Sequence, residues 1–107
     1  MDHFDLRREI IETGLEMNRM GINQGTSGNV SVRVDGGMLI TPSGIPYEEL
    51  HVQDIVFMAS DGEWEAIPGR KPSSEWRFHL DIYNNRDDAG AIVHTHAIHC
   101  TSLSMLK

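Results

Sequence analysis

The sequence has a single cysteine, no long apolar run and few basic residues. Cys100 is the only cysteine among the 107 residues, so no disulfide can form within the chain. No apolar segment approaches the roughly 20 residues that a helix needs to cross a bilayer. The first twenty residues mix charged and apolar side chains, unlike a secretory signal with its basic start and apolar stretch. We therefore expect a cytoplasmic protein with no membrane partner.

The shortage of positive charge excludes a further class of partner. Nine Lys and Arg residues stand against 16 Asp and Glu residues, which gives a net charge of −7. Nucleic acids and anionic membranes attract a basic surface, so we expect neither as a partner. A small anion remains possible, because local backbone N–H groups and hydroxyls can hold a phosphate whatever the net charge.

Length and composition indicate one folded domain. The 107 residues are 39% hydrophobic and 23% charged, which is typical of a globular chain and leaves no room for two domains. The C-terminus falls within an apolar helical pattern (Leu103, Met105, Leu106) that has no stop signal. We therefore expect residues 1–107 to be the N-terminal part of a single longer domain, truncated at the C-terminus.

The periodicity of apolar residues predicts an α/β fold with at least one antiparallel pair of strands. Its first element is an amphipathic helix over about 3–20, capped by Asp2 and ended by Gly21. Its last is a helix that begins near Ala97. The elements expected between them are a hairpin of 30–34 and 38–40, a helical turn at 47–50, a strand at 55–59, a serine-capped helix from 72–75, and a strand at 91–93.

His94 and His96 are candidate ligands of one divalent metal, with zinc as the expected ion. On a strand, residues i and i+2 point to the same face, so the two imidazoles lie side by side. A catalytic zinc needs three protein ligands and an open position, so two histidines leave the site one ligand short. Paired histidines that serve only packing or hydrogen bonding are the alternative, and the spacing does not exclude it.

Glu75 leaves three interpretations open. It is a further metal ligand, a base that transfers a proton, or a first-turn carboxylate favoured by the helix dipole. Of the remaining histidines, His99 lies three residues beyond His96 and could be a further ligand, whereas the other three lack metal-type spacing. We interpret His99 as structural, and His3, His51 and His79 as surface or packing residues.

Three short loops have the small residues that suit an anion. They are Gly28-Asn29, Ser43-Gly44 and Ser73-Ser74, and the last precedes a predicted helix, where amide donors and the dipole favour negative charge. Each loop alone is ordinary turn chemistry. Together with a metal site, they indicate a phosphorylated substrate that chelates metal.

Four segments in order resemble the class II aldolase/adducin family. They are NQGTSGNVSVR (23–33), LITPSGIPY (39–47), PSSEWRFH (72–79) and VHTHAIHCT (93–101). The resemblance runs over the whole chain and covers about the N-terminal half of a family member. It implies a central, largely antiparallel sheet flanked by helices, incomplete in this chain.

The resemblance also implies an activity and a set of roles. The activity is zinc-dependent aldol cleavage of a 1-phosphorylated ketose, such as L-fuculose 1-phosphate, to dihydroxyacetone phosphate and L-lactaldehyde. Glu75, His94 and His96 match the zinc ligands, and Glu75 also matches the group that moves a proton. Six residues match the substrate and phosphate loops: Gly28, Asn29, Ser43, Gly44, Ser73 and Ser74. A third histidine ligand would lie beyond Lys107, and the full-length protein would be a homotetramer.

Two alternatives to the aldolase stay open. One is a sibling reaction on the same scaffold, either epimerisation or dehydration of a sugar phosphate. The other is a non-catalytic binding module of the adducin type. Glu75 favours the aldolase, because the related epimerases carry aspartate there, and the histidine pair argues against adducins, which lack the metal ligands. We expect the 107-residue chain alone to be inactive, since its metal site is incomplete.

Overall fold

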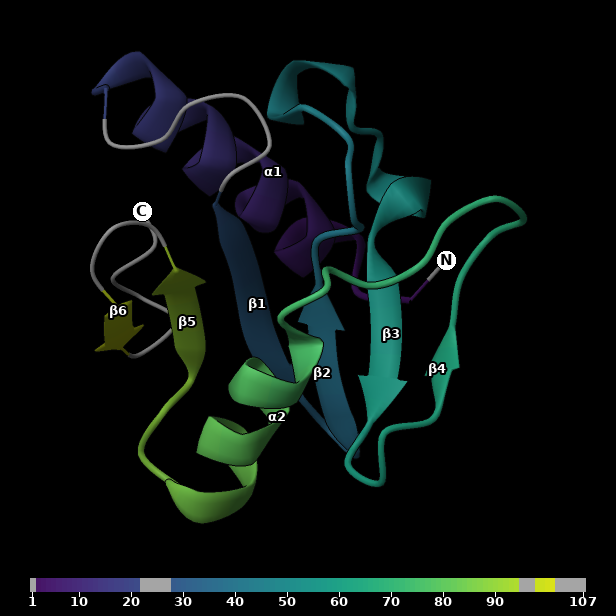
Figure 1. Ribbon diagram of the computed structural model, residues 1–107, viewed down its shortest axis with the longest axis vertical. Coiled ribbons are helices and arrows are strands. Elements are labelled where there is room, and N and C mark those ends of the chain that lie inside the picture. Colours follow the sequence, from purple (N-terminus) through teal and green to yellow (C-terminus); the bar gives the residue numbers. More distant parts are fainter. Residues whose placement is uncertain (1, 22–27, 95–97, 102–107) are drawn as a thin grey trace.

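The computed structural model describes residues 2–21 and 28–94 with their side chains, and the backbone of 98–101 (Figure 1). Within these ranges a six-stranded sheet has the order β4-β3-β2-β1-β5-β6, and every neighbouring pair is antiparallel. Its strands are β1 (Asn29–Val34), β2 (Gly37–Ile40), β3 (Val56–Ala59), β4 (Trp64–Glu65), β5 (Ala91–His94) and β6 (Ile98–Thr101). The helices are α1 (Phe4–Arg19), α2 (Trp76–Asn85) and the 3-10 turns η1 (Tyr47–Glu49) and η2 (Val52–Asp54). The predicted fold class, a largely antiparallel sheet flanked by helices, is confirmed.

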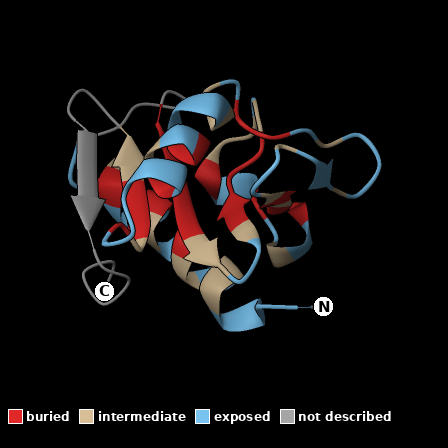
Figure 2. Cartoon of the chain, turned by 90° about the horizontal axis from the view of Figure 1, so that it is seen from below, coloured by how far each residue is buried: buried red, intermediate tan, exposed pale blue. Residues whose placement is uncertain are grey.

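The two α-helices cover opposite faces of the sheet (Figures 1 and 2). Val30 and Val32 of β1 point toward α1 and pack with Ile10 of that helix. The sheet residues that pack with Leu80 of α2 come from the alternate positions of the strands, as the period of two requires. The core is therefore two apolar layers separated by the sheet.

Helix α1 follows its apolar stripe. Ile10, Gly14 and Met17 are buried, as the spacing predicts. Gly14 has no side chain because the Tyr47 ring occupies its space: an added Cβ would lie 2.0 Å from Cδ1 of that ring. The N-cap prediction was wrong by one residue, since His3 holds that position with a φ of 62°.

The predicted final helix is wrong in the part that the structure describes. Ile98–Thr101 form β6, paired antiparallel with β5, where a helix from Ala97 was expected. The open edge of β5 offers backbone hydrogen bonds, and the β-branched Ile98 and Thr101 favour an extended chain. The apolar pattern that suggested a helix begins at Leu103, outside the described residues. Neither described α-helix is long and apolar enough to cross a membrane.

Candidate active site

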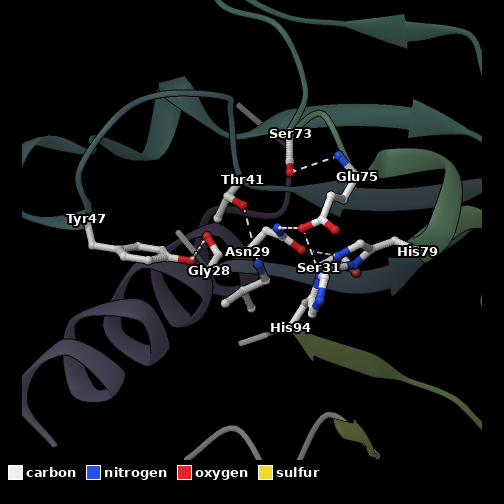
Figure 3. A network of polar contacts seen from close by, with 10 residues as sticks. Gly28, Asn29, Ser31, Thr41, Tyr47, Ser73, Glu75, His79 and His94 are labelled. Carbon is white, nitrogen blue, oxygen red and sulfur yellow. Dashed lines mark hydrogen bonds and ion pairs between the residues drawn. The ribbon is translucent and has the colours of Figure 1, made fainter. Parts of the chain in front are cut away.

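The three loops with small residues meet at one end of the sheet (Figure 3). Because β1 and β2 are antiparallel, the start of β1 lies beside the end of β2. The Thr41 amide donates to the carbonyl of Val30 at 3.1 Å, and the Val30 amide donates to Oγ1 of Thr41 at 3.3 Å. The third loop is attached by the Ser73 amide, which donates to the carbonyl of Thr41 at 2.9 Å. Segments far apart in the sequence are thereby fixed next to one another.

Strand β5 brings a histidine to the same end. His94 is paired with Asn29 in the β1–β5 register, and Glu75 immediately precedes α2 beside them. Nδ1 of His94 lies 2.9 Å from Oε1 of Glu75. The structure therefore brings together two of the three predicted metal ligands, and His96, the third, lies outside the described residues.

Glu75 is held from two sides. Nδ2 of Asn29 donates to Oε1 at 2.9 Å, and the Glu75 amide donates to Oγ of Ser73 at 3.3 Å. The predicted serine cap is wrong in detail, because Glu75 itself is the N-cap residue and Ser73 forms a turn ahead of it. The Glu75 side chain remains 42% exposed, so this held carboxylate is still accessible to solvent.

The pair of Glu75 and His94 fits part of a metal site. Nδ1 of His94 is buried and forms no hydrogen bond within residues 2–21 and 28–94, although Oε1 of Glu75 lies 2.9 Å away. Two zinc ligands with bonds of about 2.1 Å lie about 3.4 Å apart in a tetrahedral site, so the pair would need to separate only slightly. No group of three His, Cys, Asp or Glu side chains assembles among the described residues. The described pair suits a metal but does not complete its coordination.

Predicted phosphate-loop residues differ in how available they are. Gly28, Asn29 and Ser73 are buried, Ser43 is half-buried, and Gly44 and Ser74 are exposed. The amides of Ser43 and Ser73 already donate to the carbonyls of Lys71 and Thr41, each at 2.9 Å. For an incoming anion, the exposed residues Gly44 and Ser74 and the half-buried Ser43 are the more accessible sources of N–H and O–H donors.

Tyr47 anchors the first of these loops. Its hydroxyl donates to the carbonyl of Gly28 at 3.2 Å, while its ring packs on Gly14 of α1. Burial raises the pKa of Tyr47, so the hydroxyl keeps its proton and remains a donor. Sequence reasoning did not assign Tyr47 any part in the site.

A buried chain of polar side chains behind Glu75 was also missed. His79 was interpreted as a surface or packing residue, yet it is fully buried, with Nδ1 2.6 Å from Oγ of Ser31 and Nε2 bonded to Oδ1 of Asn29. Oγ of Ser31 lies 2.8 Å from the Tyr83 hydroxyl. Burial and then the neighbouring His94 lower the pKa of His79 to about 3, so the ring is neutral at pH 7. The spacing 75, 79 and 83, which places three polar residues on one helix face, was the available signal.

Residues 8–107 match the sequence profile of the class II aldolase and adducin N-terminal domain. The chain belongs to this family. The resemblance inferred from the four segments is thus confirmed, and the adducin-like alternative shares the same family.

Individual relatives are aldolases. Over all 107 residues the chain is 58% identical to an L-fuculose phosphate aldolase of Escherichia coli, of which it covers 49%. It is 52% identical over 101 residues to a 5-methylthioribulose-1-phosphate/5-deoxyribulose-1-phosphate aldolase of Rhodospirillum rubrum, covering 94% of this chain and 45% of the relative. Among solved structures, an L-fuculose 1-phosphate aldolase superposes with a TM-score of 0.79 at 41% identity, over 84% of this chain and 43% of that one. The chain thus spans about half the length of the curated relatives that it matches.

Proposed function

We propose that residues 1–107 act as the N-terminal part of a single class II aldolase domain that cleaves a 1-phosphorylated ketose. The preferred substrate is of the L-fuculose 1-phosphate type, and the products are dihydroxyacetone phosphate and L-lactaldehyde. The complete protein acts in the cytoplasm as a homotetramer. The observation that carries the proposal is the Glu75–His94 pair, with Oε1 and Nδ1 2.9 Å apart, at the meeting point of three small-residue loops.

Glu75, His94 and His96 would hold zinc, together with a histidine from outside this chain. When bound, the metal would supply Lewis acidity to the ketose oxygens and stabilise the negative charge that develops on them. Nδ1 of His94 supports this role, because it is buried, lies 2.9 Å from Oε1 of Glu75 and forms no hydrogen bond within residues 2–21 and 28–94, which is costly for a buried nitrogen. Gly28, Asn29, Ser43, Gly44, Ser73 and Ser74 would hold the substrate and its phosphate.

Glu75 also has the position of a proton-transfer group. When the C3–C4 bond of the ketose breaks, the C4 hydroxyl loses a proton as the aldehyde forms, and C3 must gain one. Asn29 binds Oε1, and no described residue donates to Oε2. We assign the delivery of this proton to Oε2 of the half-exposed side chain: it takes up a proton from solvent, passes it to C3 and is ionised again, while the proton of the C4 hydroxyl leaves to solvent.

A hybrid protein tests the proposal. This chain is fused to the remaining half of the Escherichia coli relative, replacing the part to which it is 58% identical over 107 residues. We expect the hybrid to release aldehyde from L-fuculose 1-phosphate, to lose this activity to a chelator, and to regain it with zinc. Chelator-insensitive cleavage, or no cleavage by a folded hybrid that binds zinc, would contradict the proposal.

A second class of substrate should be tested in the same assay. Relatives at 52% and 50% identity are aldolases of 5-deoxyribulose 1-phosphate, so the carbon chain beyond C4 is the part that distinguishes the candidates. Faster cleavage of that substrate would keep the protein an aldolase but change its preferred substrate to 5-deoxyribulose 1-phosphate. A product with an intact carbon chain would instead favour an epimerase or dehydratase, and a hybrid that binds no zinc would favour a non-catalytic module.

A further inference from the structure

A hydrogen-bonded chain of buried side chains leads from Tyr83, near the end of α2, to Glu75. It runs from Tyr83 through Ser31, His79 and Asn29 to the carboxylate. Figure 3 shows its part from Ser31 to Glu75. Ser31 and His79 are fully buried, and Asn29 nearly so. The proposed reaction uses Asn29 and Glu75, at one end of this chain, and gives His79 no task.

The chemistry of the partners fixes the direction of every bond. An ionised carboxylate only accepts, so Nδ2 of Asn29 donates to Oε1 of Glu75. Oδ1 of Asn29 then faces His79, and a carbonyl oxygen only accepts, so Nε2 of His79 must carry a proton. The neutral ring has a bare Nδ1, which must accept from Ser31. Oγ of Ser31 in turn accepts from the Tyr83 hydroxyl.

All four donors therefore point toward Glu75. The reverse orientation of the Asn29 amide would place its oxygen against the carboxylate, two acceptors in a buried contact, and would turn its NH₂ group toward His79. The Nε2–H tautomer of His79 prevents that rotation. Hydrogen bonds in such a chain also polarise one another, which strengthens the last donor.

We propose that His79 is a positioning residue: through the amide of Asn29 it holds Glu75 as an oriented carboxylate beside His94. The inference rests on the proposed function for the consequence in catalysis. Its structural part, the tautomer and the orientation of Asn29, does not depend on the reaction.

Two substitutions at position 79 separate positioning from packing. In His79→Gln the side-chain NH₂ reaches the place of Nε2 and still donates to Asn29. His79→Leu fills the space without a donor. Leu80→Ala is the matched control, because Leu80 is the next residue of α2, is 8% exposed, and packs in the apolar layer.

In the hybrid, we expect His79→Leu to lower kcat about 10- to 100-fold. The affinity for zinc, measured by competition with a chelator, should also fall, as it does when a group that orients a metal ligand is lost. KM should change little, because the exposed loop residues Gly44 and Ser74 are not part of the hydrogen-bonded chain that contains His79. His79→Gln should recover most of kcat and of zinc affinity. Leu80→Ala should lower the free energy of unfolding and leave kcat and zinc affinity unchanged. Equal kcat and zinc affinity in the wild type and a folded His79→Leu variant would overturn the proposal.

Imidazole ¹H–¹⁵N correlation spectra of the metal-free hybrid supply a readout independent of activity. We expect the neutral Nε2–H tautomer for His79, and the Nδ1–H tautomer would contradict the proposal. If His79→Leu does not fold, Ser31→Ala takes its place: it removes the donor to Nδ1 and should give a smaller loss of kcat in the same direction. An inactive wild-type hybrid with the Nε2–H tautomer would count against the proposed function and leave the positioning contact supported.

Discussion

The two faces of the sheet are built differently. The face under α1 is closed by apolar side chains of Ile10, Val30 and Val32. The face under α2 contains an apolar layer too, but Ser31 and His79 are buried within it. Burying polar groups costs free energy unless each finds a partner, and here each one does. The α1 face therefore contributes mainly to stability, whereas the polar side chains buried on the α2 face orient the site.

Strand β1 contributes side chains to both faces of the sheet. Val30 and Val32 point to α1, while Asn29, Ser31 and Arg33 occupy the alternate positions toward α2. Asn29 contacts Glu75, the residue before α2, and Ser31 contacts His79 in its middle. The Arg33 guanidinium donates to the carbonyl of Tyr83 near the end of α2 and to those of Arg86 and Ala89 just beyond it. One strand therefore sets the position of α2 along its whole length.

The largest expected effect is on the polar side of this comparison. Glu75→Gln keeps the shape but removes the charge and the proton-transfer group, so kcat of the hybrid should fall about 10²- to 10⁴-fold with the fold intact. Glu65→Gln on β4, an exposed carboxylate outside the site, is the control and should leave kcat unchanged. Similar kcat values for the two variants would remove Glu75 from the mechanism.

On the apolar face the expected effect is on stability. Ile10 is fully buried, so Ile10→Ala should lower the free energy of unfolding by about 2–5 kcal/mol. Activity per folded molecule should not change, because Ile10 has no polar link to the site. Leu15→Ala, at an exposed position of the same helix, should fall within about 0.5 kcal/mol of the wild type in urea unfolding. A loss of kcat at saturating zinc in folded Ile10→Ala would break the division between the faces.

His79 should make the free energy of unfolding depend on pH, and this effect is of intermediate size. Its pKa is about 3 in the fold, where burial and His94 lower it from the ordinary value of 6.5, so the unfolded chain binds the extra proton more readily. Its contribution to stability is complete above pH 6.5 and declines as the pH falls toward 3, by about 1.4 kcal/mol per pH unit. Urea unfolding of the wild type and of His79→Gln between pH 7 and pH 4 isolates the contribution of His79 to the pH dependence of stability. Parallel stability curves would show that His79 is not held neutral.

The smallest expected effect lies at the far end of the polar chain. Tyr83→Phe removes the hydroxyl that faces Ser31 and keeps the ring, so it should cost about 0.5–1.5 kcal/mol in thermal or urea unfolding. The loss of kcat should be smaller than that of His79→Leu. A larger loss than at position 79 would place the critical contact at Tyr83 instead.

Sequence reasoning succeeded where local pattern decides. The stripe of α1, the hairpin of β1 and β2, and the loops with small residues follow from periodicity and turn chemistry. It failed where a distant element decides. Ser31 and Arg33 alternate with valines as solvent-facing residues do, and only the packing of α2 covers them. Likewise β6 depends on the free edge of β5, which no local pattern records.

The site divides in the same way. Glu75 and His94 were predicted because carboxylate and imidazole suit a metal, and the structure brings them together. The hydrogen bonds of His79 were not predicted, because its partners, Ser31 and Asn29, are 48 and 50 residues away in the sequence. A histidine is assigned by its neighbours in space, and spacing along the chain gives those only within a helix or strand.

The central claim is that Glu75 and His94 bind one metal at the meeting point of the loops. Anomalous diffraction at the zinc absorption edge from crystals of the hybrid tests it most directly. The account predicts one strong peak per chain, bonded to Oε of Glu75 and to an imidazole nitrogen of His94, and its loss in His94→Ala. A peak bonded to neither side chain, or none from protein soaked with zinc, would contradict it.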